Sequence, residues 1–178
     1  MTDSIVPDDK DWTWVLERAC PECGVDASGI EATSVAGMIR SNADEWAELL
    51  VAPAADLRRR PVPDRWSTLE YSAHVRDVFV LYRYRLGLMV DHEDPLFPNW
   101  DQDETAVAER YNELDPVVVS AELVGAGRQL ADAFDTMIGD QWSRTGRRSD
   151  GASFTIDSFA RYLIHDPVHH LWDVQRSV

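Results

Sequence analysis

The chain has 178 residues, of which 44% are hydrophobic and 28% charged, as expected for one soluble globular domain that buries a core without disulfides or metal staples. Its net charge of −15 repels phosphate backbones and anionic lipid heads, so we expect neither nucleic acid nor membrane as a partner. The first residues, MTDSIVPDDKDWTW, show no basic and apolar leader, and no stretch approaches the roughly 18 apolar residues of a membrane span. These features predict a cytoplasmic protein.

Residues 1–32 show no sustained hydrophobic period and are predicted to form an irregular arm ahead of a domain over residues 33–178. From a cap at Thr33 or Ser34, apolar residues at i, i+3 and i+4 predict a first helix to about residue 51. Prolines then predict a loop of extended chain, at Pro53, Pro61 and Pro63.

The start of the second helix carries the clearest local signal. Ser67 can cap the helix while Glu70 reaches back to the cap, which is the pattern of a capping box. Trp66 and Tyr71 occupy the two positions of a hydrophobic staple. The sequence therefore predicts a helix from this point to about Val90.

Two further helices are predicted after an acidic loop over residues 91–104. A short helical piece is expected at 103–113, and Asp115-Pro116 offers a cap followed by proline at the first position of a third helix that ends near Gly139. The polar run SRTGRRSDGAS is predicted to be a loop. A fourth helix begins near Thr155 and should kink or loosen at Pro167. Four amphipathic helices predict an all-α four-helix bundle.

Three of the five histidines fall on predicted inward faces. His165 and His169 are four residues apart, so on a helix they lie about 40° apart in azimuth and about 6 Å apart along the axis, close enough to share one ion. His170 is turned about 100° from His169 and is predicted, like His92, to be a surface or packing residue. His74 lies on the apolar stripe of the second helix, which Tyr71, Val75 and Val78 define.

These histidines predict a divalent metal bound by His74, His165 and His169 in the bundle core. Three imidazoles with an open position are typical of a catalytic metal, because structural zinc is usually closed by four protein ligands. Asp77 near His74, and Asp166 or Asp173 near the other pair, are candidates for carboxylates that orient the imidazoles. The alternative is that these are hydrogen-bonded core histidines without a metal.

The chain resembles the DinB/YfiT-like superfamily of four-helix bundles in the segments PDRWSTLEYSAHVRD and LIHDPVHHLWDV. This resemblance implies that His74, His165 and His169 bind a divalent ion, commonly zinc or nickel. It also implies a homodimer and a low-molecular-weight thiol as cosubstrate, as in mycothiol or bacillithiol transferases and mycothiol-dependent isomerases. In such a site the cation's charge stabilises the thiolate, which is the reactive nucleophile.

Cys20 and Cys23 form a separate motif in the arm, CPECG, with the spacing and turn residues of a zinc knuckle. Two thiolates make only half of a second metal site, so closure would need His92, His170, carboxylates or a second subunit. The alternative is a pair of reduced thiols with no ligand.

Three functions follow from these patterns. The first is a metal-dependent thiol S-transferase or isomerase acting on a small molecule. The second is a metal-dependent hydrolase in the same pocket, with water as the nucleophile and a carboxylate such as Asp166 as the base. The third is a non-catalytic metal-binding or interaction module.

Overall fold

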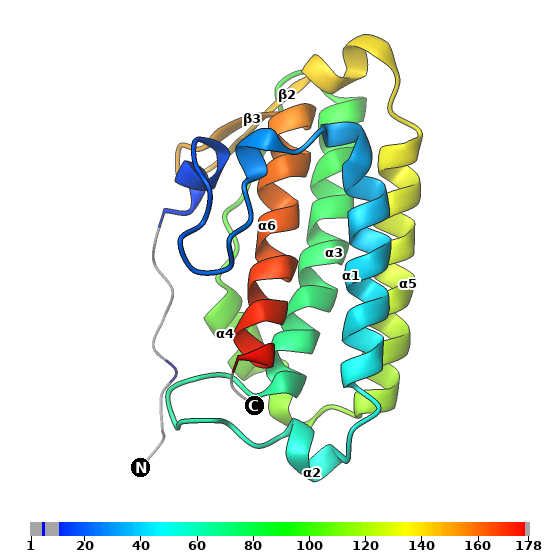
Figure 1. Ribbon diagram of the computed structural model, residues 1–178. Helices are drawn as coiled ribbons and strands as arrows, with labels where there is room; N and C mark the ends of the chain where they lie inside the picture. The colour runs from blue at the N-terminus through cyan, green and yellow to red at the C-terminus, as the bar shows by residue number, and fades with distance from the viewer. Residues whose placement is uncertain (1–4, 6–10, 177–178) are drawn as a thin grey trace.

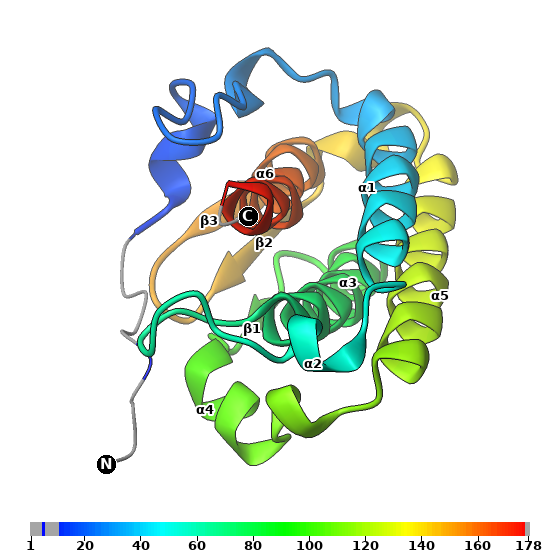
Figure 2. The same ribbon diagram turned by 60° about the horizontal axis from the view of Figure 1, so that its bottom comes forward.

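Four long helices form the body of the protein in the computed structural model, which describes residue 5 and residues 11–176. They are α1 (Val35–Leu49), α3 (Thr68–Asp91), α5 (Pro116–Asp135) and α6 (Ile156–Gln175). Helices α5 and α6 each pack on both α1 and α3 (Figures 1 and 2). The core between them holds fully buried aromatic and aliphatic side chains, among them Trp46, Phe79, Leu123, Leu130 and Phe159. The predicted four-helix bundle is confirmed.

The start of α3 has the predicted geometry. The Glu70 carboxylate accepts a hydrogen bond from the Ser67 backbone N–H (2.8 Å), and Ser67 Oγ accepts one from the Glu70 N–H (3.3 Å). The rings of Trp66 and Tyr71 meet edge to face at 5.4 Å, as a hydrophobic staple requires. Arg60 pairs with the Glu70 carboxylate from the preceding loop. These contacts fix the direction in which the first turns of α3 enter the bundle.

Helix α6 continues through Pro167 without a break. Proline has no N–H to donate within the helix. Its own carbonyl oxygen, however, accepts a hydrogen bond from the buried side chain of Asn42 on α1 (3.1 Å). This contact joins α1 to the middle of α6, between the helical turns that carry the histidines.

The connections hold more structure than the sequence predicts. A three-stranded sheet of order β1-β2-β3 is formed by segments that were expected to be loops, with β1 parallel and β3 antiparallel to β2. The strands are β1 (Leu96–Phe97), β2 (Thr145–Arg148) and β3 (Ser153–Thr155). The proline-rich loop also contains the short helix α2 (Ala54–Leu57), and the helical piece expected at 103–113 consists of α4 (Gln102–Ala108) and a 3₁₀ turn (Tyr111–Glu113). A further 3₁₀ turn (Gly139–Ser143) follows α5.

The sheet packs tightly against the end of α3. A Cβ atom at Gly146 would lie 2.7 Å from Cγ of Met89 and 3.1 Å from the ring of Phe97. Phe97 of β1 and Phe154 of β3 are both buried. The strands therefore cover one end of the core, and this explains why the two connections are ordered as strands.

The described part of the arm lies along α6. It forms three 3₁₀ turns, Thr13–Leu16, Ala27–Gly29 and Ala32–Ser34, all in contact with α6 (Figure 1). Val15 and Ala27 are fully buried. Apart from residue 5, the first ten residues of the predicted arm lie outside the described residues. The arm therefore forms an outer layer on α6, on the side away from α5 (Figure 2).

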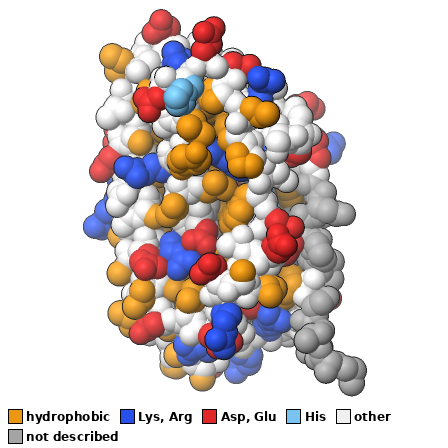
Figure 3. Space-filling model, turned by 180° about the vertical axis from the view of Figure 1, so that it is seen from behind, with side chains coloured by type: hydrophobic (Ala, Val, Ile, Leu, Met, Phe, Trp, Pro, Cys, Tyr) orange, Lys and Arg blue, Asp and Glu red, His pale blue; other side chains and the backbone are white. Residues whose placement is uncertain are grey.

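The surface mixes charge with apolar groups. On the face turned away from the viewer of Figure 1, hydrophobic side chains lie between acidic and basic ones (Figure 3). Among the described helices, none combines the length and apolar character needed to cross a membrane.

Candidate functional site

Two i, i+4 pairs of ligating side chains are interleaved on α6. The first pair is His165 and His169, and the second is Asp166 and His170. Neighbouring residues on a helix are about 100° apart in azimuth, so the two pairs face different partners. The first pair faces the arm and the second faces α3.

The pair that faces the arm meets both cysteines. Cys20 Sγ lies 3.7 Å from His169 Nδ1, and Cys23 Sγ lies 3.6 Å from His165 Nε2. One ligand atom from each of the four residues lies within 4.8 Å of all the others. Both cysteines are free thiols. The four side chains have the donor types of a Cys2His2 zinc site.

Burial sets the protonation of this cluster. Burial lowers the pKa of His165 to about 4, with a contribution from His169. It also lowers the pKa of His169, assisted by His170. Burial raises the pKa of the Cys23 thiol to about 11, against the opposing hydrogen bond from the Val25 backbone N–H. Near neutral pH the imidazoles are therefore uncharged, which is the form that binds metals.

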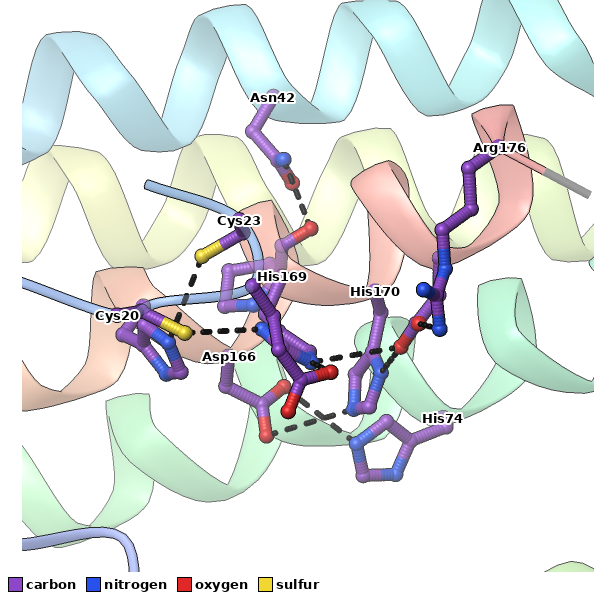
Figure 4. Close-up of polar contacts among 12 residues, drawn as sticks. Cys20, Cys23, Asn42, His74, Asp166, His169, His170 and Arg176 are labelled. Carbon is purple, nitrogen blue, oxygen red and sulfur yellow. Dashed lines mark hydrogen bonds and ion pairs between the residues drawn. The ribbon is translucent and has the colours of Figure 1, made fainter. Parts of the chain in front are cut away.

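The pair that faces α3 meets His74. Nε2 of His74 lies 3.4 Å from Asp166 Oδ1, and Nε2 of His170 lies 3.8 Å from Asp166 Oδ2 (Figure 4). The rings of His74 and His170 are 4.9 Å apart. These three residues form a second group whose ligand atoms lie within 4.8 Å of one another. Two imidazoles and one carboxylate can bind a divalent cation.

Aromatic rings hold His74 in place. Trp100 stacks on its imidazole at 5.4 Å and 2° between the planes, and Trp66 lies 5.3 Å from it. His74 has no exposed surface. Burial opposes ionisation of Asp166, but His170 and His74 outweigh it and lower the pKa of Asp166 to about 2. The carboxylate is therefore ionised at neutral pH.

A cavity of about 770 Å³ lies beside both groups. Asp166, His170, His165 and His169 line it from α6. The other walls come from the arm, α3, the segment around α4 and the β2–β3 turn, through Asp11, Trp12, Val78, Tyr82, Arg85, Trp100, Gln102, Asp103, Arg148 and Asp150 among others. This volume is in the range of small-molecule sites.

The grouping differs from the sequence interpretation. His74, His165 and His169 were expected around one ion, but the structure separates His74 from the other two, because α6 turns Asp166 and His170 toward α3. His170, which was expected to be a packing residue, is the residue missed. The signal for it was its spacing of four from Asp166.

The remaining candidates are also placed. Asp77 lies away from both groups, where it accepts hydrogen bonds from Tyr111 and from Arg76 (2.8 Å). His92 is exposed at the end of α3. The arm cysteines lie beside His165 and His169 of the same chain, neither of which was among the partners expected for them.

Comparison with known proteins identifies the family. None of the curated proteins compared with the chain matches it significantly. Among solved structures, the chain is similar to YfiT from Bacillus subtilis, called "a probable metal-dependent hydrolase with an unusual four-helix bundle topology", with a TM-score of 0.64 at 15% identity over 97% of this chain and 93% of that one. That likeness shows the fold. The family model of the DinB superfamily matches residues 38–174, and the chain therefore belongs to the DinB superfamily.

Proposed function

We propose that the protein is a metal-dependent enzyme for a small molecule, with His74, Asp166 and His170 as the ligands of the cation. The observation that carries the proposal is the convergence of these three groups from two helices beside the 770 Å³ cavity. Among the described residues, no fourth ligating side chain belongs to this group. A site with three protein ligands leaves a position for a nucleophile or a substrate.

The buried polar atoms at this site fit a cation. Nδ1 of His74 is buried without a hydrogen-bond partner among the described residues, and His74 Nε2 and Asp166 Oδ1 have only each other, at 3.4 Å. Leaving a buried polar group without a partner costs about 1–3 kcal/mol. A coordinated cation would satisfy such atoms. The nitrogen and oxygen donors suit zinc or nickel, the ions that the family resemblance implies, as well as other divalent metals.

Side chains of the protein hold the proposed ligands in position and set the charge of the site. When bound, a divalent cation would supply positive charge that lowers the pKa of a small nucleophile and polarises an electrophile. Trp66 and Trp100 hold the His74 ring and exclude water from its faces. Asp166 contributes the negative charge that offsets the cation.

A buried arginine indicates the charge of the substrate. Arg85 lines the cavity, is 3% exposed and donates to the Pro98 carbonyl (2.8 Å). Its Nε is buried without a hydrogen-bond partner, and within the described residues its guanidinium meets the rings of Phe97 (5.0 Å) and Tyr82 (5.6 Å) but no carboxylate at ion-pair distance. A buried cation without an anion is unfavourable. We therefore infer a substrate with an anionic group that Arg85 binds.

Hydrolysis is the reaction that these observations favour. A carboxylate oxygen is a harder donor than an imidazole nitrogen. A site with one carboxylate therefore suits water as the nucleophile better than a site of three imidazoles does, and it suits a soft thiolate less well. The description of YfiT as a probable hydrolase supports the same choice. The thiol S-transferase or isomerase predicted from the resemblance is the second candidate, because the cavity volume leaves room for a cosubstrate thiol beside an electrophile.

The test combines activity with metal content. Zinc- or nickel-loaded protein is assayed against small anionic amides and esters without thiol, and then against monochlorobimane with mycothiol or bacillithiol. We expect thiol-independent hydrolysis that falls at least about 100-fold in His74→Ala and Asp166→Asn. His92→Ala is the matched control, since His92 is exposed and outside both groups.

The results of these assays decide between the alternatives. Turnover only with added thiol would assign the S-transferase reaction instead. Any activity that is unchanged in both His74→Ala and Asp166→Asn would refute the proposed centre. A second readout is the metal bound per chain, which should fall in these two variants even where no substrate is found. Arg85→Met should raise KM for an anionic substrate more than it lowers kcat.

We also propose a homodimer, as the resemblance implies. Val80 and Tyr84 are one turn apart on α3 and are 56% and 60% exposed, so this face can supply apolar contact area. Light scattering should give twice the chain mass of 20.2 kDa, and Tyr84→Glu should shift it toward the monomer.

A further inference from the structure

We propose that Cys20, Cys23, His165 and His169 bind a zinc ion in a closed tetrahedral site that fastens the arm to α6. This site is separate from the proposed reaction centre and does not depend on it. The cysteines also lie outside the residues 38–174 that match the family.

The distances between the donor atoms fit a tetrahedral ion. Zinc lies about 2.3 Å from thiolate sulfur and about 2.0–2.1 Å from imidazole nitrogen. At a tetrahedral angle these bonds separate sulfur from nitrogen by about 3.6 Å. The structure gives 3.7 Å for Cys20 and His169 and 3.6 Å for Cys23 and His165. Four donors within 4.8 Å of one another leave no position for a substrate.

The backbone of the arm is built as a knuckle. The Gly24 N–H donates to the Cys20 carbonyl (2.9 Å), and the Cys20 N–H donates to the Val25 carbonyl (2.8 Å). Gly24 has a φ of +77°, which a residue with a Cβ rarely adopts. The Val25 N–H also hydrogen-bonds the Cys23 sulfur. This turn directs both sulfurs to the same side, toward α6.

The surroundings orient and shield the histidines. Nε2 of His169 lies 3.6 Å from Asp173 and 4.0 Å from Glu22, so its other nitrogen is directed at Cys20. Carboxylates commonly orient metal-binding imidazoles in this way. The Trp12 ring covers His165 and His169 at 5.3 and 5.2 Å. Two thiolates also neutralise the charge of a Zn²⁺ ion, which suits a buried site.

The proposed zinc ion would stabilise part of the cavity wall. Asp11 and Trp12 line the cavity and belong to the arm that the knuckle fastens. The arm meets α6 through its short 3₁₀ turns. A zinc ion here would hold the cavity wall in place without taking part in the reaction.

The experiment uses the intact chain. Protein purified under reducing conditions is dialysed against EDTA, and its zinc is measured before and after the thiols are blocked with a mercurial. We expect one EDTA-resistant zinc per chain that is released on blocking. Cobalt substituted into this site should give a thiolate-to-cobalt charge-transfer band and tetrahedral visible bands.

Variants separate this site from the other group. Cys23→Ser should remove the charge-transfer band or shift it markedly and lower zinc affinity more than about 100-fold. His74→Ala is the matched control and should keep the resistant zinc, since His74 belongs to the other group. If Cys23→Ser does not fold, the wild-type protein with and without zinc replaces it, and amide exchange of residues 11–25 should rise on zinc removal while that of α3 does not.

Other results would overturn the proposal. One is metal-depleted protein that has free thiols but takes up no zinc. Another is a cobalt spectrum without the charge-transfer band. A third is a Cys20–Cys23 disulfide in protein kept under reducing conditions. Loss of the resistant zinc in His74→Ala would place the ion elsewhere. None of these results depends on finding a substrate, so failure here is distinguishable from failure of the proposed enzyme function.

Discussion

Replacement of Arg60 by alanine should destabilise the protein at the first turn of α3. Arg60 Nε donates to Glu70 Oε2 (3.0 Å), and the Glu70 side chain is only 5% exposed. Loss of the arginine leaves a nearly buried carboxylate with the Ser67 N–H as its remaining capping partner. Breaking a fully buried ion pair costs about 3–5 kcal/mol, whereas an exposed pair contributes less than about 1 kcal/mol. Because the Arg60 side chain is 28% exposed, we expect a loss between these limits, about 2 kcal/mol.

The assay is thermal and urea unfolding of Arg60→Ala beside Arg59→Ala. A loss of about 2 kcal/mol lowers Tm by roughly 4–8 °C in a chain of this size. Arg59 is the matched control, because its contact with Asp56 joins side chains that are 74% and 53% exposed, and its loss should cost less than about 0.5 kcal/mol. Equal stability of the two variants would refute the reasoning. A double-mutant cycle with Glu70→Gln would then show whether any coupling exists.

Three further changes test other contacts. Gly146→Ala places a Cβ 2.7 Å from a methionine of α3, and overpacking of this kind should cost about 1–3 kcal/mol in urea unfolding. Asn42→Ala removes the donor to the Pro167 carbonyl and should cost about 1–3 kcal/mol, measured in the same way. The hydrogen bond from Arg148 lowers the pKa of Asp150 below its ordinary 3.8; the stability it contributes is present above that pH and is lost as pH falls toward the lowered value. Asp150→Asn should therefore reduce the stability lost on acidification by less than about 1 kcal/mol, because the Asp150 side chain is 36% exposed. An unchanged acid limb would contradict this.

The fold was predictable where the signals are local. The capping box of Ser67 and Glu70 and the Asp115-Pro116 helix start depend on residues within one turn, and both occur in the structure. The strands were not predictable in the same way. β1 has two residues and pairs with β2, about fifty residues later in the chain, so no local period reveals it. What the sequence does contain is Phe97 and Phe154, apolar residues in polar connections that the core buries.

The site was predictable only as far as its residue types. The spacing of His165 and His169 indicates that they share one metal ion, but Asp166 and His170 have the same spacing. The rotation of α6 decides which pair faces His74, and packing against α1, α3 and the arm sets that rotation. The cysteines likewise predicted half of a site. Their partners lie more than 140 residues away in sequence, so only the fold identifies them.

The interleaved pairs on α6 make the length of the chain before them critical. Insertion of one residue ahead of His165 would rotate all four ligating side chains by about 100°, so that His165 and His169 would face α3 and no pair of ligating side chains would face the arm. A point substitution can impair one of the two groups of ligating side chains at a time, whereas a one-residue insertion in the helix would disable both groups together. We therefore expect α6 to accept changes of residue type far more readily than changes of residue number between Thr155 and His170.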